Sequence, residues 1–144
     1  MSSNESVLQW ERRWSEARLV RRIRMDPVAA RKRQELARVN IKRAKRELAG
    51  GDLDASLIFA EQALINAADA VLARDGFSAG SHVVRFSYPL LPALYSDERH
   101  VIDQVRSARN TAQYDASGTV DAALAARGLN LAERATRDVA NLLT

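Results

Sequence analysis

Residues 53–72, LDASLIFAEQALINAADAVL, carry apolar side chains around most of the circumference of a helix. The apolar positions of this stretch are Leu53, Leu57, Phe59, Ala60, Ala63, Leu64, Ala67, Ala68, Val71 and Leu72. A helix that is apolar on most sides belongs at the centre of a bundle. Asp52 is placed to cap its start and Gly76 to end it, so the sequence predicts a central helix over about residues 52–75.

The chain on either side of this stretch also has helical periodicity. Residues 27–49 carry a narrow apolar stripe between many basic residues, and Asp26 and Pro27 are suited to the start of a helix. Further helices are expected at residues 5–24, at 96–114, and from Thr119 to the end. Gly128 interrupts the last stripe without breaking its period, so close helix packing is expected there. Residues 77–95 contain Pro89 and Pro92 and allow only short helical pieces.

Composition favours the same class of fold. The chain of 144 residues has six glycines, three prolines and 6% aromatic residues, which is too few for a turn-rich β fold. It is long enough for one domain. We therefore predict an all-α antiparallel bundle of about five helices, with residues 1–26 as an N-terminal amphipathic extension and residues 27–144 as the bundle.

Several classes of site and location are disfavoured. Cysteine is absent, which excludes disulfides and thiolate chemistry. There is no HExxH, Walker-type or GxGxxG pattern, so neither a metal nor another cofactor is expected. The N-terminus lacks the order of a secretory signal, and no uninterrupted apolar run of membrane-spanning length occurs. These features predict a soluble cytoplasmic protein without a membrane partner.

Charge is distributed unevenly along the chain. Residues 1–50 hold 14 Lys and Arg against 6 Asp and Glu, whereas residues 51–144 hold 8 against 12. Nearly all of the basic residues are arginine, which binds phosphate in a forked geometry. A polyanion is one partner that suits this half, with Arg43 and Arg46 as candidate nucleic-acid contacts. The alternative is that these arginines pair with the acidic half of the protein or of a dimer mate.

A polar band follows the apolar stripe of the helix predicted at 96–114. On a helical wheel Arg109 falls at the margin of that stripe, and Arg106, Asn110, Gln113 and Tyr114 continue the polar face. An arginine against apolar surface needs a counter-charge. That partner is either an anionic ligand or a carboxylate, supplied locally or from another helix, and the sequence leaves both open.

The segment Arg109-Asn110-Thr111-Ala112-Gln113-Tyr114 resembles the signature of the HEPN family, an arginine followed by a polar residue and then a histidine four to six residues after the arginine. Tyrosine stands where histidine is expected. Arginine followed by an Ala-x-Tyr element is similar to a HEPN branch encoded beside minimal nucleotidyltransferases in toxin–antitoxin modules. The helix order over about residues 30–143 agrees with the family layout.

The resemblance implies roles for individual residues. Arg109 would face phosphate, Asn110 would orient it, and Tyr114 would occupy the histidine position. Tyrosine titrates near 10 and is a poor general base, so metal-independent RNA cleavage is in doubt. Tyr114 remains a surface for base stacking and a candidate acceptor of a transferred nucleotide that would switch the protein off.

The family also implies a homodimer. Arg109 and Tyr114 are about 140° apart on a regular helix, so a working site needs helices from two subunits. Neither His82 nor His100 has the motif spacing. His82 is expected to brace a turn, with a catalytic role as its alternative, and His100 reaches the site only from a neighbouring subunit.

Three functions follow from this pattern. The leading hypothesis is a HEPN-like partner of a toxin–antitoxin module that binds RNA, or cleaves it without metal, around Arg106 and Arg109. The alternative is a non-catalytic protein that holds a nucleotide or acts as a scaffold for a nucleotidyltransferase antitoxin. A third is a nucleic-acid binder that uses the basic helix 27–49 alone.

Overall fold

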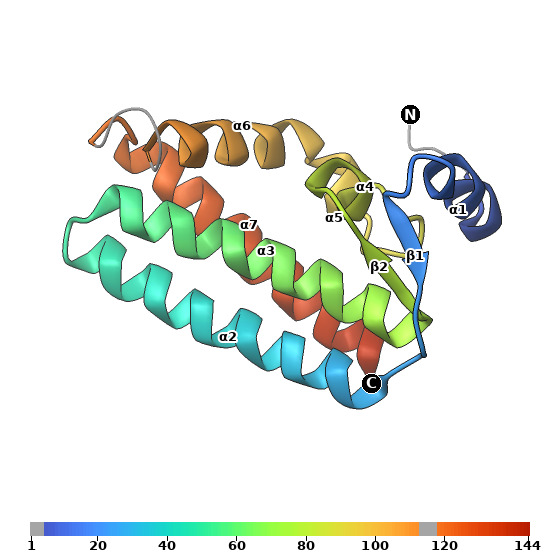
Figure 1. Cartoon of the computed structure of the whole chain (residues 1–144). Coiled ribbons are helices and arrows are strands. Elements are labelled where there is room, and N and C mark those ends of the chain that lie inside the picture. The colour runs from blue at the N-terminus through green and yellow to red at the C-terminus, as the bar shows by residue number, and fades with distance from the viewer. Residues whose placement is uncertain (1–4, 113–117) are drawn as a thin grey trace.

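The computed structural model describes residues 5–112 and 118–144, and it confirms the all-α class. Three long helices, α2 (Pro27–Ala49), α3 (Leu53–Asp75) and α7 (Ala122–Leu143), lie along one another, and α6 (Arg99–Asn110) crosses over α3 and α7 (Figure 1). The remaining elements gather at one end of the bundle. They are α1 (Val7–Ser15), β1 (Val20–Arg22), β2 (Phe77–Ala79), α4 (His82–Phe86) and α5 (Leu94–Asp97).

The predicted helix ends are formed by the residues named for them. Asp26 accepts a hydrogen bond from the amide of Ala29 at 2.9 Å, and Asp52 accepts one from Ala55 at 3.0 Å. Gly76 follows α3 with a φ of 86°, a left-handed conformation that suits glycine. These caps set the lengths of α2 and α3, and the two helices run antiparallel through a short turn.

α3 is the core helix. Leu57, Leu64, Val71 and most of its alanines are buried between α2, α6 and α7. By length and composition it also qualifies as a membrane span, but 72% of its apolar window is packed inside the protein, as in the core helix of a soluble bundle. The cytoplasmic location stays a prediction.

Gly128 lies where three helices meet. A Cβ atom at this position would come within 3.1 Å of Leu57 on α3 and 3.3 Å of Val105 on α6. The predicted close packing is therefore confirmed, and a side chain at this position would require Leu57 and Val105 to move.

The prediction of a single helix over residues 5–24 is wrong. α1 ends at Ser15, Arg18 has a φ of 59°, and the chain then pairs as β1 with β2 in an antiparallel two-stranded sheet. In β1, Val20 is buried in the core and the next two residues face solvent. The helical period of the first helix therefore does not continue through this segment. β2 likewise replaces part of the irregular stretch expected after α3.

Candidate functional site

α6 places Arg109 against the central helix. Val101, Ile102 and Val105 are buried and fix the face of α6 that packs on α3 and α7. Arg109 follows one turn after Val105, and its side chain is 21% exposed. Its Nε atom lies 3.5 Å from a carboxylate oxygen of Glu61 on α3. Of the two alternatives for the partner of Arg109, the structure shows the carboxylate on another helix.

Glu61 is a buried carboxylate in an otherwise apolar helix. Its side chain is only 3% exposed. Burial raises the pKa of Glu61, and the positive charges of Arg109 and Arg106 oppose that rise without cancelling it. The two arginines are three residues apart on α6, so they lie on neighbouring turns above the same carboxylate. α3 thus supplies an internal anion under the polar face of α6.

A second carboxylate, Asp69, lies two turns further along α3. Arg85 on α4 binds it through Nε at 2.6 Å, and Arg33 on α2 approaches it at 3.8 Å. The Arg85 guanidinium also donates to Nδ1 of His82 at 2.6 Å and to the carbonyl of Ala79 at 3.3 Å. Arg85 is therefore held by three partners and acts as a structural link between α3, α4 and β2.

His82 lies closer to the arginines of α6 than its sequence position suggested. Burial lowers the pKa of His82, and the charges of Arg85, Arg106 and Arg109 lower it further. Because Nδ1 accepts a hydrogen bond from Arg85, the neutral ring carries its proton on Nε2. In this arrangement His82 accepts the hydrogen bond that ties it to Arg85, a contact within α4 that suits a bracing role. His100 is exposed in the first turn of α6, about 13 Å along the helix from Arg109.

We call these residues the α3–α6 cluster: Arg33, Glu61, Asp69, His82, Arg85, Arg106 and Arg109. It contains four guanidinium groups against two carboxylates, and Arg106 and Arg109 are partly exposed at its edge. An excess of arginine at a partly buried site suits an anion such as phosphate. Among the described residues no group of three or more His, Asp or Glu is arranged to hold a metal ion.

The other predicted site residues have different surroundings. Asn110 is exposed and accepts a hydrogen bond from Arg109 at 3.4 Å, and its orienting role stays a prediction. Tyr114 falls in 113–117, outside the described residues. Its contribution to the site stays a prediction.

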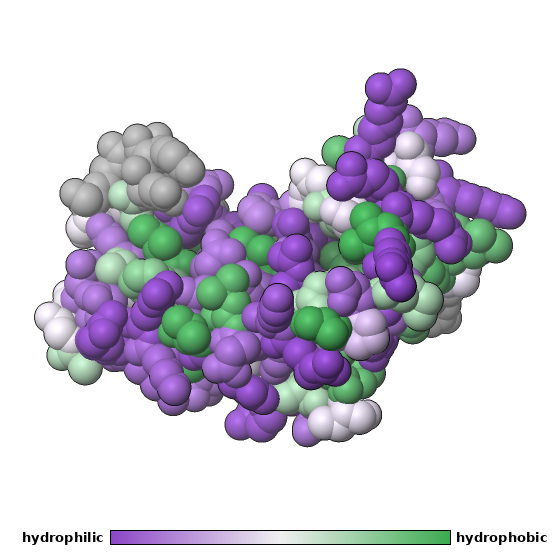
Figure 2. Space-filling view, turned by 60° about the horizontal axis from the view of Figure 1, so that its bottom comes forward, coloured by the Kyte–Doolittle hydropathy of each residue, from purple (hydrophilic) through white to green (hydrophobic). Residues whose placement is uncertain are grey.

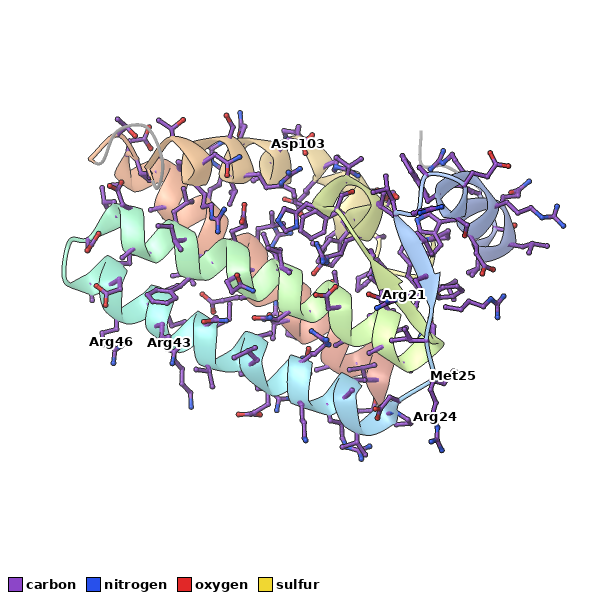
Figure 3. All side chains as sticks on the ribbon, in the orientation of Figure 1. Arg21, Arg24, Met25, Arg43, Arg46 and Asp103 are labelled. Carbon is purple, nitrogen blue, oxygen red and sulfur yellow. The ribbon has the colours of Figure 1, made fainter. Side chains whose placement is uncertain are left out.

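The three arginines predicted to bind nucleic acid are not on one surface. Arg43 lies over the ring of Phe59 at 5.8 Å, and Arg46 is 3.9 Å from Glu47. Both are on α2, whereas Arg106 is on α6, on the other side of α3 (Figure 3). The fold therefore separates Arg43 and Arg46 from the α3–α6 cluster.

The two acidic members of the cluster, Glu61 and Asp69, were not among the predicted site residues. Glu61 and Asp69 are eight residues apart within the most apolar helix, a spacing that places both on one face. A carboxylate inside a core helix needs a cation partner, and that was the available signal.

The chain matches a known protein family. A family model described as "HEPN domain" matches residues 30–142, most of the chain. No curated protein and no solved structure was found to match.

Proposed function

Because this chain belongs to the HEPN family, we propose that it binds RNA at the α3–α6 cluster, with Arg106 and Arg109 contacting phosphate. HEPN domains are in general RNase-like or nucleotide-interacting. The observation that carries the proposal is the excess of guanidinium groups over carboxylates around a partly exposed edge of α6.

Glu61 gives the site its geometry. It holds the Nε side of Arg109, while Asn110 holds one of the terminal nitrogens. Two fixed contacts orient the plane of the guanidinium, which lowers the entropy lost when it binds phosphate. Arg106 lies one turn away and supplies a second positive charge for the same anion.

The protein works as a homodimer in this proposal. A twofold pairing along α6 would place two copies of Arg106, Arg109 and Asn110 beside one cleft. The larger partly exposed surface would then accommodate an RNA strand rather than one phosphate. Analytical ultracentrifugation of the wild-type chain should give a dimer mass, and a strictly monomeric protein at micromolar concentration would contradict this part.

RNA binding is tested by fluorescence anisotropy with a uridine oligomer of about 12 nucleotides in EDTA. The double variant Arg106→Gln/Arg109→Gln should bind at least tenfold more weakly and should lower the slope of log affinity against log salt by about 1.4, the value for two phosphate contacts. Arg127→Gln is the control, because Arg127 is exposed on α7 and is not a member of the cluster. Wild-type affinity in the double variant would overturn the proposal.

Cleavage is measured on the same RNA by gel electrophoresis, without added metal. A HEPN ribonuclease would lose cleavage in Arg109→Ala while remaining folded and dimeric. The second candidate function, a non-catalytic RNA- or nucleotide-binding partner, is favoured by His82, whose Nδ1 atom is occupied by Arg85 and is not available as a base. That protein would bind RNA and leave it intact.

The toxin–antitoxin role rests on the resemblance of residues 109–114 to the branch encoded beside nucleotidyltransferases. It predicts a stoichiometric complex with a nucleotidyltransferase encoded by a neighbouring gene, and transfer of a nucleotide to Tyr114. Co-purification and intact-mass measurement with Tyr114→Phe as control test both points. A mass increase that persists in Tyr114→Phe would contradict the assignment of the acceptor.

A further inference from the structure

A basic groove runs between α2 and α7, on a different side of the bundle from α6. It consists of two adjoining hollows of about 520 and 440 Å³, which share Glu35, Arg38 and Ala140. Along α2 the lining extends from Val28 to Lys45, about 25 Å at the rise of a helix. We call this surface the α2–α7 groove. It is long enough for an extended polymer rather than a single small ion.

The lining of the groove has a net positive charge. Its basic residues are Arg31, Lys32, Arg38, Lys42, Lys45 and Arg137, and its acidic residues are Glu35 and Glu133. Six positive and two negative charges leave +4, which equals the net charge of the whole chain. The face of the molecule on which α2 lies is accordingly hydrophilic, with apolar patches between the charged side chains (Figure 2).

The acidic residues of the groove neutralise little of this charge. Glu35 lies 3.2 Å from Arg38, and Glu133 lies 3.2 Å from Lys45. All four side chains are between 38% and 64% exposed, so these pairs are screened by water and weak. An anionic ligand can replace either carboxylate at small cost.

Two buried polar atoms lie in the lining. Gln34 is 5% exposed and Thr136 is 7% exposed, and within the described residues neither Gln34 Oε1 nor Thr136 Oγ1 has a hydrogen-bond partner. The amide nitrogen of Gln34 donates to the carbonyl of Thr136 at 2.7 Å, which fixes Gln34 across the groove. A buried polar atom without a partner is costly, and here Gln34 is among the residues that line one hollow and Thr136 is among those that line the other.

We propose that the α2–α7 groove is a second binding site, for single-stranded RNA, distinct from the α3–α6 cluster. The basic side chains bind successive phosphates. Gln34 Oε1 requires a donor, which ionised phosphate and carboxylate groups lack, whereas a ribose 2′-hydroxyl or a base amine supplies one. The Thr136 hydroxyl, in the adjoining hollow, can donate to or accept from a sugar or base edge there. RNA therefore suits both the charge of the groove and the polar side chains in its lining.

The lining explains what kind of recognition to expect. Apolar Val28, Ile41 and Leu143 contact sugars and base faces, and no aromatic side chain from the described part of the chain lines either hollow. Without stacking platforms the groove reads the backbone, so binding is independent of sequence and depends strongly on salt. An acidic helix from a partner protein would satisfy the charge but not Gln34 Oε1, because its backbone donors are used within the helix.

The test uses anisotropy with the uridine oligomer of about 12 nucleotides and the full chain carrying Arg106→Gln/Arg109→Gln, so that the α6 site does not contribute. Adding Lys42→Gln/Lys45→Gln should weaken the remaining binding at least fivefold and reduce the salt slope by about 1.4. The matched control adds Arg24→Gln/Arg127→Gln, two exposed arginines outside the groove, and should change affinity less than twofold. Equal losses in both variants, or no loss in the groove variant, would overturn the proposal.

Thr136→Val separates binding from structure. Valine has a similar shape and removes the buried hydroxyl, so the folded state should be as stable as wild type or more stable, while RNA affinity falls about threefold. A purely structural role for Thr136 predicts unchanged RNA affinity.

Preferential binding of a poly-glutamate peptide over the oligomer would instead identify an acidic protein partner and reject RNA. Because Arg106 and Arg109 are absent from this background, failure here leaves the proposed function intact.

Discussion

α2 and α3 are antiparallel neighbours of equal length, 23 residues each, and they use charged residues in opposite ways. α3 is buried on nearly all sides, and its two inward carboxylates, Glu61 and Asp69, each face an arginine from another helix. α2 buries a narrow alanine-rich stripe and exposes its lysines and arginines. The comparison indicates that charge inside the bundle organises the fold, whereas charge on α2 remains available to a ligand.

Among the variants that test this comparison, Asp69→Ala is expected to change the free energy of unfolding most. It leaves the guanidinium of Arg85, 13% exposed, without its main counter-charge, and should lower the free energy of unfolding by about 3 kcal/mol. Glu35→Ala on α2 is the matched control and should cost less than about 0.5 kcal/mol, because its pair with Arg38 is exposed. Urea denaturation followed by circular dichroism measures both. Equal losses of stability in the two variants would contradict the distinction between buried charge on α3 and exposed charge on α2.

Gly128→Leu tests the packing around α3. A leucine side chain would enter the space taken by Leu57 and Val105 and should destabilise the fold by about 1–3 kcal/mol. Arg127→Leu, the adjacent exposed position on α7, should have little effect on stability. Thermal unfolding of the two variants checks this, and a wild-type midpoint for Gly128→Leu would show that the three helices separate without cost.

Glu61→Gln tests the buried carboxylate of α3 through the pH dependence of the free energy of unfolding. Because the pKa of Glu61 is raised in the folded protein, the folded state binds a proton that the unfolded chain releases, and wild-type stability falls as pH rises from the ordinary pKa of glutamate to the raised one. Glutamine has no such loss. The variant should therefore gain stability relative to wild type as pH rises above about 4, the ordinary pKa of glutamate. A constant difference across this range would contradict a raised pKa.

His82→Gln should have the smallest effect on stability. Its pH dependence should have the opposite sign to that of Glu61→Gln. The pKa of His82 is lowered on folding, so below about pH 6.5 the unfolded chain binds a proton that the folded chain does not, and stability falls as pH falls. Glutamine can accept the hydrogen bond from Arg85 and removes this dependence. Denaturation at several pH values should show a flatter profile for the variant near pH 6, and parallel profiles would exclude the shift.

Local patterns predicted much of the fold. The apolar run of residues 53–72, the caps at Asp26 and Asp52, and the close approach at Gly128 depend on neighbours in sequence or on residue size. Pairing of β1 with β2 was not predictable from such patterns, because it joins segments more than fifty residues apart and each strand has only three residues.

The candidate site was predictable only in part. The position of Arg109 at the margin of the apolar stripe followed from the period of α6, and so did its need for a counter-charge. Its partner Glu61 and the nearby His82 come from other helices, and only the tertiary fold brings them together. Arg43 and Arg46 were chosen for their charge. Each directly follows a lysine that lines the groove, Lys42 or Lys45, and therefore lies about 100° away from it around α2.

The burial of Trp10 has a consequence for how this protein can be divided. Its indole is fully buried, packs on Phe77 and Tyr88 with ring centroids 5.4 and 4.8 Å away, and donates to Ser87 at 3.1 Å. A fragment trimmed to the matched segment 30–142 would uncover these rings and leave one edge of β2 unpaired. Such a fragment would tend to aggregate through that surface. The segment that matches the family model is therefore shorter than the segment needed for a stable fold.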